Sequence, residues 1–543
     1  KYQSTTSTYN KYNTESYYLN ALQDYICGNV TSDEKARMTD AFDDFNSVLS
    51  NLVGNPNNST IRTQVVTTAQ TFTEYVNSVA ANMQKLQDEA NTEIKSCVDQ
   101  INAYADKIAS LNRQINTIEA YGNKANDLRD QRSLLIDELS EYCNVETLEK
   151  EPADGVGETQ YYVYVNGNML VDTYNTNKLV VKQKETYSNL GDITGCYDVK
   201  WADGSSFSTH SSILGGKLQA LFEMRDGNNG TIVDGTVKSY DEGTKILTID
   251  RTNCNDVMKL NIPDYDGEIV INNRTYAYDS FEVKVDGDGN FSYEFKLKDG
   301  NSSLLQTAID NGYTAHVGTA VSAKGIPYYM AQLNEFVRTY AQEFNRIQNE
   351  GLDLYDEKGI DFFNASIPTT GENYVMSESV DGKDSGFTSV VGDANADGTY
   401  TGSYYYMTAL NFCVTKEMLG DPGKIACKSV GEDGASVGND NGDNIQRLTE
   451  LKDDGNMFVH GEPDAFLQSL TSALGVNAKK ADSLAKSQSN LMYAIDSNRK
   501  SVSGVDEDEE GSDLIIFQNM LMNQYKVLSV MNEVLDKLIN GMV

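Results

Sequence analysis

An apolar repeat of helical spacing runs almost unbroken from Ile61 to Ile118, and it constrains the fold more than any other feature of the chain. Its apolar residues recur every three or four positions, which places them on one face of a helix. A single helix over this segment is about 85 Å long. Globular helices are seldom so long, so the segment predicts a rod-like bundle or a coiled coil.

A second helical pattern ends the chain, between Ser501 and Val543. Leucine recurs there with heptad spacing, and other apolar residues fill the offset position, which gives an a/d seam of about four heptads. The helix either lies in the core of a single-domain bundle or becomes buried only when subunits assemble. We predict an assembly face that consists of Leu514, Phe517, Leu521, Tyr525, Leu528, Met531, Leu535 and Leu538. Four further residues widen this face beyond what one partner helix covers: Met520, Val527, Val530 and Val534.

Composition limits the classes of function that the chain supports. At 543 residues the chain is too long for one hydrophobic core, so about two to four domains are expected. Its formal net charge of -36 argues against binding to nucleic acid or to anionic membrane surfaces. No apolar run approaches the length of a membrane span. The 7 Cys are scattered and form no CxxC pair, so they indicate neither a disulfide framework nor a zinc site.

Helical patterns lie toward both ends of the chain and strand patterns lie between them. Besides the two helices above, helices are expected within 1–55 and at 126–143, 216–225, 326–348, 444–451, 463–474 and 479–499. The clearest strand candidates are 161–165, 179–181, 246–250, 268–271, 281–285 and 291–297, and residues 352–412 are expected to be β or irregular.

This order predicts an α+β multidomain fold, in which a long helical coiled-coil rod is formed by the N- and C-terminal parts and carries inserted β-rich domains. The rod is expected to comprise 1–148, 213–226, 326–350 and 413–504. A β-rich outer domain is expected from 149–212 and 351–412, an inserted β domain from 227–325, and an inner-core assembly helix from 505–543.

Two acidic loops, 286–290 and 393–398, resemble the first half of an EF-hand calcium loop. The first has Phe291 where glycine turns the chain, and the second has Tyr404 where the bidentate glutamate belongs. Turns are therefore the favoured interpretation of both loops. The 33 Tyr cluster at 161–162, 328–329 and 404–406, where edge positions on solvated sheets are favoured over a glycan-binding face.

Motifs that carry catalysis are missing from the sequence. The chain has no HExxH, GxGxxG or phosphate-binding glycine loop. Its acidic pairs are so numerous that none is singled out as a glycosidase dyad. We therefore predict no enzyme activity, no catalytic residue, no metal site and no cofactor.

The C-terminal residues Ser501 to Val505, followed by Asp508 to Glu510 and the long apolar helix, resemble the C-terminal signature of the hook-associated protein 1 family of flagellar axial proteins. Five further stretches resemble motifs of the same family and occur in the same order: 126–132, 215–226, 326–345, 351–363 and 421–444. The resemblance therefore extends over nearly the whole chain.

Three features depart from the family pattern. The family begins with an N-terminal helix that pairs with the C-terminal helix, and we expect this chain to lack that segment. The helices at 216–226 and 326–345 usually follow one another closely, whereas here 227–325 separates them as an extra β domain. Members of the family are poor in cysteine, so the 7 Cys of this chain support no disulfide assignment.

The resemblance implies an extracellular structural protein at the hook–filament junction of the bacterial flagellum, which self-assembles and serves motility. It implies that the rod forms the tube wall, that the C-terminal helix lines the inner core and that the β domains face outward. The implied partners are a ring of like subunits, the hook protein, the second hook–filament junction protein and an export chaperone at the C-terminal region. Export by the flagellar secretion apparatus is expected.

Three other interpretations remain open. The chain can be another axial protein, such as flagellin or the second junction protein, although neither accounts as well for the central motifs. It can be an adhesin-like surface protein whose β insertions bind glycans. It can also carry a glycosidase or protease domain at 227–325, an interpretation that no motif supports.

Overall fold

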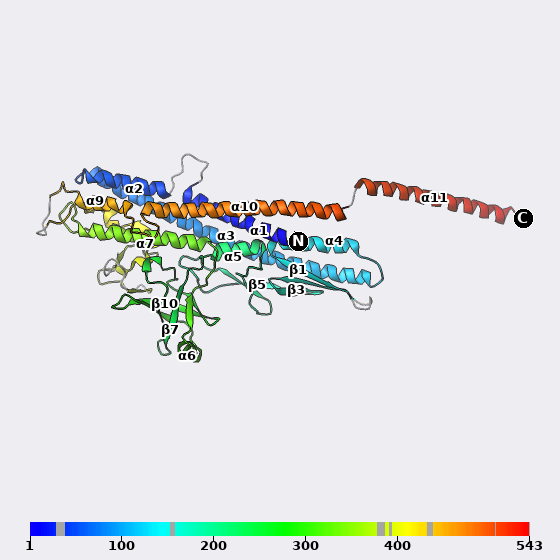
Figure 1. The fold of residues 1–543 in the computed structure, drawn as a ribbon, viewed down its shortest axis with the longest axis horizontal. Helices are drawn as coiled ribbons and strands as arrows, with labels where there is room; N and C mark the ends of the chain where they lie inside the picture. The colour runs from blue at the N-terminus through cyan, green and yellow to red at the C-terminus, as the bar shows by residue number, and fades with distance from the viewer. Residues whose placement is uncertain are drawn as a thin grey trace.

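The computed structural model describes residues 1–28, 38–151, 158–376, 386–389, 394–431, 438–504 and 507–541. The molecule is elongated (Figure 1). Long helices lie side by side along its axis, the β structure projects from one side of them, and the last helix extends beyond one end (Figure 1). This agrees with the predicted α+β fold, in which helices from both ends of the chain form one rod.

The helices of the described residues fall into long rod helices and shorter connecting ones. They are α1 Tyr2–Cys27, α2 Met38–Val53, α3 Ser59–Glu119, α4 Asn126–Tyr142, α5 Gly216–Asp226, α6 Ser302–Asp310, α7 Ile326–Glu350, α8 Lys416–Gly420, α9 Asp443–Glu450, α10 Pro463–Ser503 and α11 Glu507–Asn540. Short 3-10 helices are η1 Val257–Lys259, η2 Tyr404–Tyr406, η3 Pro422–Lys424 and η4 Leu451–Asp453.

The predicted long helix is α3, a single helix of 61 residues. Asn58 caps it, because its side-chain oxygen accepts the N–H groups of Thr60 and Ile61 at 3.0 and 3.2 Å. The apolar repeat is buried along its length, with Phe72 and Ile101 fully covered. Helix α1 packs along α10, so the N-terminal and C-terminal parts of the chain share one helical core.

Aromatic side chains fill the part of the rod where α2, α3 and α7 meet. The ring of Phe42 lies 5.5 Å from Phe72, 5.7 Å from Phe336 and 5.1 Å from Tyr340, measured between ring centroids. Such tilted and edge-to-face pairs add to the stabilisation that burial provides. All four rings are fully buried. The apolar residues that recur at helical spacing in α2 therefore form the face of this helix that packs into the core.

Two small sheets lie beside α3 and precede α5. The first is an antiparallel sheet in the order β1-β2-β3-β4, formed by β1 Val145–Lys150, β2 Gln160–Val165, β3 Asn168–Asp172 and β4 Asn175–Thr176. The second pairs β5 Leu179–Gln183 with β6 Tyr197–Trp201. Asn102 of α3 ties this pair to the rod, because its amide exchanges two hydrogen bonds with the backbone of Leu179 at 2.8 and 2.9 Å.

The largest sheet has the order β11-β8-β7-β12-β9-β10-β15, and β11 also pairs with β10. Six of its strands therefore close into a barrel, which leaves β15 attached to the outside of β10. The strands are β7 Val233–Asp241, β8 Ile246–Asp250, β9 Gly267–Ile271, β10 Arg274–Val285, β11 Phe291–Leu297, β12 Thr314–Val317 and β15 Gly386–Thr388. Within 352–412, β13 Phe363–Ala365 pairs with β17 Phe412–Val414, and β14 Tyr374–Met376 runs parallel to β16 Tyr400–Gly402.

The barrel leaves the rod and returns to it at one point. Asn228 and Lys324 form an antiparallel bridge, and the N–H of Gly325 donates to the carbonyl of Gly227 at 3.0 Å. Because β15 comes from outside 227–325, the sheet also draws on the segment expected to form the outer domain. The two ends of the segment 227–325 thus lie next to each other, and one strand of its sheet, β15, comes from outside this segment.

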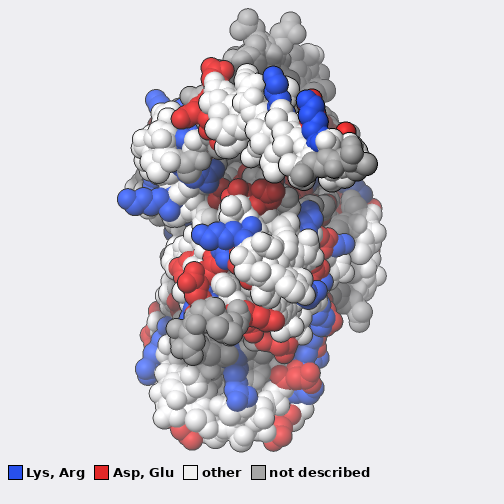
Figure 2. Space-filling model, turned by 90° about the vertical axis from the view of Figure 1, so that its right-hand side faces the viewer, with Lys and Arg blue, Asp and Glu red and all other residues white. Residues whose placement is uncertain are grey.

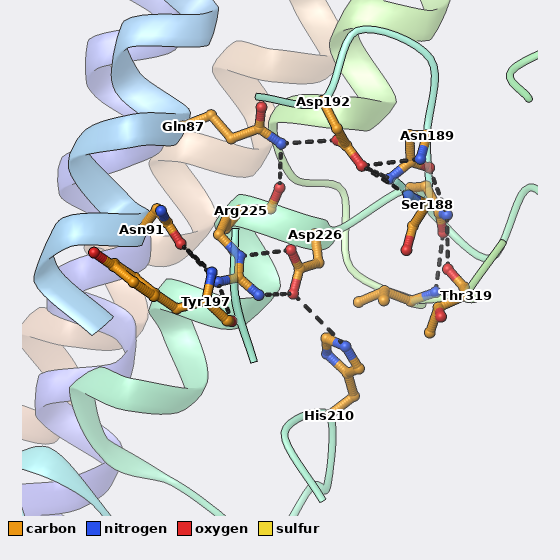
Figure 3. A network of polar contacts seen from close by, with 12 residues as sticks. Gln87, Asn91, Ser188, Asn189, Asp192, Tyr197, His210, Arg225, Asp226 and Thr319 are labelled. Carbon is orange, nitrogen blue, oxygen red and sulfur yellow. Dashed lines mark hydrogen bonds and ion pairs between the residues drawn. The ribbon is translucent and has the colours of Figure 1, made fainter. Parts of the chain in front are cut away.

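A network of buried polar contacts fixes the root of the barrel to α3 (Figure 3). The guanidinium of Arg225 donates to both carboxylate oxygens of Asp226, at 2.7 and 2.8 Å. It also donates to Asn91 Oδ1 at 3.0 Å and to the carbonyl of Tyr197 at 2.8 Å. Burial raises the pKa of the Asp226 carboxyl, but Arg225 outweighs burial, so the pKa lies below its ordinary value. His210 lies 3.7 Å from the same carboxylate, and burial lowers its pKa.

Amide side chains extend this network to the barrel (Figure 3). Gln87 Nε2 donates to Asp192 Oδ1 and to the carbonyl of Arg225, both at 2.9 Å. Asn228 Nδ2 donates to Asn189 Oδ1 at 2.9 Å and to the carbonyl of Thr319 at 3.0 Å. Rod, loop and barrel are therefore held together by a network of buried and partly buried hydrogen bonds.

The structure corrects several sequence-based expectations. The helices expected at 463–474 and 479–499 are one helix, α10, because packing against α1 continues across Gly475. The tyrosines at 404–406 are buried in η2 and do not lie on a solvated sheet edge, since Tyr405 packs under the barrel and donates to the carbonyl of Ile262 at 2.5 Å. The expected strands did not include β1, β3, β4, β6, β7 or β12, and the expected helices did not include α6 or α8. No helix within the described ranges is both long enough and apolar enough to cross a bilayer.

Candidate assembly interface

The end of α10 is fastened to the rod immediately before the terminal helix begins. Arg499 Nη1 forms an ion pair with Asp137 Oδ2 of α4 at 2.6 Å, and its guanidinium lies 4.5 Å from the ring centroid of Tyr2 in α1. Asp137 also accepts a hydrogen bond from Gln3 at 3.2 Å. Two rod helices, α1 and α4, thus converge on the last turns of α10, which fixes the point from which α11 departs.

Helix α11 follows with 34 residues, a length of about 50 Å. Four acidic residues occupy its first turn, and Lys537 occupies its last turn, so both ends carry the charge that the helix dipole favours. None of its described residues is buried. The helix projects from the body along the long axis (Figure 1).

The structure places all eight predicted assembly residues on this exposed helix. Leu521 and Leu535 are 50% exposed, Phe517 is 65% exposed, and the other predicted residues fall between these values. The eight side chains share one face, as the heptad spacing predicts. The end-on view shows this helix with a largely uncharged surface and acidic residues toward its start (Figure 2).

The apolar surface of α11 is wider than the sequence seam. Ile515, Ile516, Met522 and Ile539 are also exposed, and they lie outside the a/d positions that the heptad pattern selects. Polar residues mark the opposite side with helical spacing: Asn519, Asn523, Lys526, Glu533 and Lys537. A helix that is apolar over most of its circumference is suited to burial among several neighbours.

Exposed apolar side chains on this scale favour association. Each leucine, phenylalanine or methionine contributes about 1.5–3 kcal/mol when it becomes fully buried. The predicted face therefore offers on the order of 10–20 kcal/mol before the costs of association are subtracted. Helices in proteins gain most of their stability from packing against other elements, and an isolated helix is only marginally stable in water. The stability of α11 therefore depends on a partner.

The acidic loop at 286–290 closes the β10–β11 hairpin. Asp286 Oδ1 accepts the N–H groups of Asp288 and Asn290, each at 2.9 Å. In the other loop, Asp393 lies outside the described residues. Among the residues that the structure does describe, no group of three His, Cys, Asp or Glu side chains is placed to hold a metal ion.

Cysteines act as packing groups in the described core. Burial raises the pKa of the Cys97 thiol to about 12 and raises that of Cys143 further. Cys427 is also buried, beside Arg62. A raised pKa keeps a thiol protonated and unreactive at neutral pH.

Comparisons with known proteins agree with this architecture. Residues 27–242 match a family model described as the flagellar hook-associated protein FlgK helical domain. The flagellar hook-associated protein 1 of Bacillus subtilis is 22% identical, over 95% of this chain and 78% of its own length. That of Escherichia coli is 23% identical, over 94% of this chain and 82% of its own length. The chain is thus similar to flagellar hook-associated protein 1 over nearly its whole length.

A solved structure is also similar, that of the flagellar hook junction protein FlgK from Burkholderia pseudomallei. It covers 92% of this chain and 100% of its own, with 14% identity and a TM-score of 0.49. The hook-associated protein 1 family model ends just after β7, so it spans the rod helices α2 to α5 and the small sheets between them. Helix α11 lies outside the residues that this model matches.

Proposed function

We propose that the protein is a structural subunit of the bacterial flagellum that joins the hook to the filament. One observation carries this proposal together with the similarity to hook-associated protein 1: a helical rod ends in an exposed helix whose apolar face is available to other subunits. A junction must satisfy two neighbours with different mechanics. A rigid rod with a separate assembly helix meets that need, because subunits can be fixed through α11 while the rods adjust their packing.

The domain roles follow from this proposal. The rod parts 1–148, 213–226, 326–350 and 413–504 form the tube wall, and 505–543 forms the inner core through the eight assembly residues of α11. The β parts 149–212, 227–325 and 351–412 face outward. Projection of the barrel from one side of the rod supports this arrangement (Figure 1).

The proposed partners and location have the same basis. A ring of like subunits would cover the apolar face of α11, and the hook protein and the second hook–filament junction protein would adjoin it. Before assembly, an export chaperone would shield the same face during passage through the flagellar secretion apparatus. The protein would thus act outside the cell, by mechanical coupling and without catalysis.

The double variant Leu521→Asp/Leu528→Asp tests this function when it is introduced into the gene in cells. Both side chains are at least 50% exposed, so the purified variant should melt at the wild-type temperature. Swimming in soft agar should be lost and filament protein should be shed into the medium, because two carboxylates cannot be buried in an apolar contact.

The matched control is Asn519→Asp/Asn523→Asp, which adds the same charge to the polar side of the same helix. Control cells should swim normally, and both variants should reach equal total levels in the cells and the medium taken together. Normal swimming by the leucine variant would contradict the proposed role of α11. A greatly lowered melting temperature would instead show that α11 belongs to the folded core.

A further inference from the structure

A cavity of about 370 Å³ lies where the barrel segment meets the rod. Its walls come from α7, from the turn 255–259 around η1 and from the loop 456–459 that precedes α10. Val459 lines the cavity and is 78% exposed, so this wall reaches solvent. The volume is at the small end of the range for ligand pockets, roughly 300–1,000 Å³, and suits a single amino-acid residue.

Arg338 of α7 holds the η1 wall in position. Its side chain is fully buried, and its guanidinium donates to the carbonyls of Leu260 and Met258 at 2.8 and 3.3 Å. It also donates to the carbonyls of Tyr405 and Met407 at 2.6 and 2.8 Å. The arginine thus fixes the turn against the rod, and its own charge is committed to these four carbonyls.

The loop wall is held by aromatic packing. The ring of Phe458 stacks on Phe336 with a centroid distance of 5.6 Å, and it lies 4.6 Å from Phe466. Phe458 and Gly461 exchange two backbone hydrogen bonds, at 3.1 and 3.0 Å, which close the loop. The cavity is therefore preformed, and binding an occupant would cost little free energy for ordering its walls.

Two polar groups of α7 line the cavity and lack partners. Gln342 is only 7% exposed, yet its Nε2 has no acceptor among the described residues. Glu335 is half-buried two turns earlier, and its carboxylate has no hydrogen bond or ion pair within the described part of the chain. An unpaired buried donor and an unpaired carboxylate are both costly, so both favour an occupant.

The other charged groups of the lining are already paired. Glu343 forms an ion pair with Arg346 at 2.9 Å, and Asp256 lies 3.6 Å from Lys259. Burial raises the pKa of Glu335, Lys259 opposes this, and the net pKa remains raised. Lys259 and Arg338 therefore offset the burial of Glu335 only in part, and a further positive charge beside this carboxylate would be favoured.

We propose that this cavity binds an arginine or lysine residue of an adjoining polypeptide. The cationic head lies at Glu335, the backbone carbonyl accepts from Gln342 Nε2, and the aliphatic stem packs on Met457 and Phe458. The adjoining polypeptide is a neighbouring subunit of the flagellum, and this source rests on the proposed function. The chemistry of the site rests on the cavity alone.

The experiment uses the full chain with methionine methyl groups labelled with carbon-13. Met258 and Met457 line the cavity and report on its occupancy. N-acetyl-arginine amide should shift both methyl resonances and reach saturation. N-acetyl-citrulline amide has nearly the same shape without the charge, so it should bind at least about tenfold more weakly, because charge-assisted hydrogen bonds are roughly twice as strong as neutral ones.

Variants separate the two contacts. Glu335→Gln should weaken binding of the arginine amide about tenfold and remove its advantage over citrulline, and Gln342→Met should weaken both ligands. Glu343→Gln is the matched control, because that carboxylate lines the same cavity but is already paired; it should change affinity less than about twofold. The proposal is overturned if neither amide shifts the methyl groups, if citrulline binds as well as arginine, or if methyl glucoside binds there and arginine does not. These measurements need no assembly, so they are independent of the junction proposal.

Discussion

Asp226→Asn should destabilise the rod strongly, although it replaces only one side-chain oxygen with an amide nitrogen. The carboxylate of Asp226 accepts two hydrogen bonds from Arg225, whose side chain is 2% exposed. An asparagine retains one acceptor oxygen and leaves the guanidinium without its counter-charge. The remaining acceptors, Asn91 Oδ1 and the carbonyl of Tyr197, are neutral.

The expected cost follows from this geometry. Removing one partner of a buried ion pair costs about 3–5 kcal/mol, because the other charge stays buried and unpaired. Two neutral acceptors remain, so we expect about 3 kcal/mol. Removing the charge as well, in Arg225→Met/Asp226→Asn, should recover part of this loss, since the double variant leaves no unpaired charge.

Urea unfolding followed by the helical circular dichroism of the full chain measures these differences. Asp106→Asn is the control, because Asp106 pairs with Lys178 at 2.8 Å with both side chains about half exposed. Such surface pairs contribute about 0–1 kcal/mol. If Asp226→Asn costs no more than Asp106→Asn, the network in Figure 3 does not hold the barrel root to the rod, and our reasoning is refuted.

Two further predictions concern protection and pH. Backbone amides of Leu521 and Leu528 should exchange with solvent far faster in the monomer than those of Ile94 and Ile101, which are fully buried in α3, and equal protection would contradict the isolation of α11. Burial raises the pKa of Glu15 to about 8 from an ordinary 4.5. Between these pH values the folded chain holds a proton that the unfolded chain releases. The contribution of this proton to the free energy of unfolding is therefore fully present below about pH 4.5 and is lost as the pH rises through 8. Glu15→Gln should therefore match the wild type near pH 5 and exceed its free energy of unfolding near pH 9 by at least about 1.4 kcal/mol, the value of one pKa unit, and an equal difference at both pH values would contradict this.

Local periodicity carried most of the prediction of the rod. Helix α3 and the α11 seam follow from residues three, four and seven positions apart, and such neighbours contact each other in any helix. The break expected after Leu474 failed because α1 packs across Gly475, and a glycine in a helix costs only about 1 kcal/mol. Tertiary packing overrides a local signal of that size.

Features that depend on distant residues could not be predicted in this way. Closure of the barrel requires β10 to pair with β11 as well as β9, and β15 joins from beyond α7. The lining of the cavity likewise brings Gln342 together with a turn of the barrel segment and a loop before α10. Each residue in these contacts is ordinary in its own sequence context, so no local pattern marks it.

The exposed state of α11 is informative because the rod is complete without it. The described core closes around α1, α3, α7 and α10, and their apolar stripes are buried. An exposed helix with an apolar face this large is a liability for an isolated protein, since such patches promote non-specific association. This exposure is what the proposed role requires, because a helix that contacts other subunits must present its apolar face outside the rod. The same separation explains why charge on α11 should abolish swimming without affecting the melting of the rod.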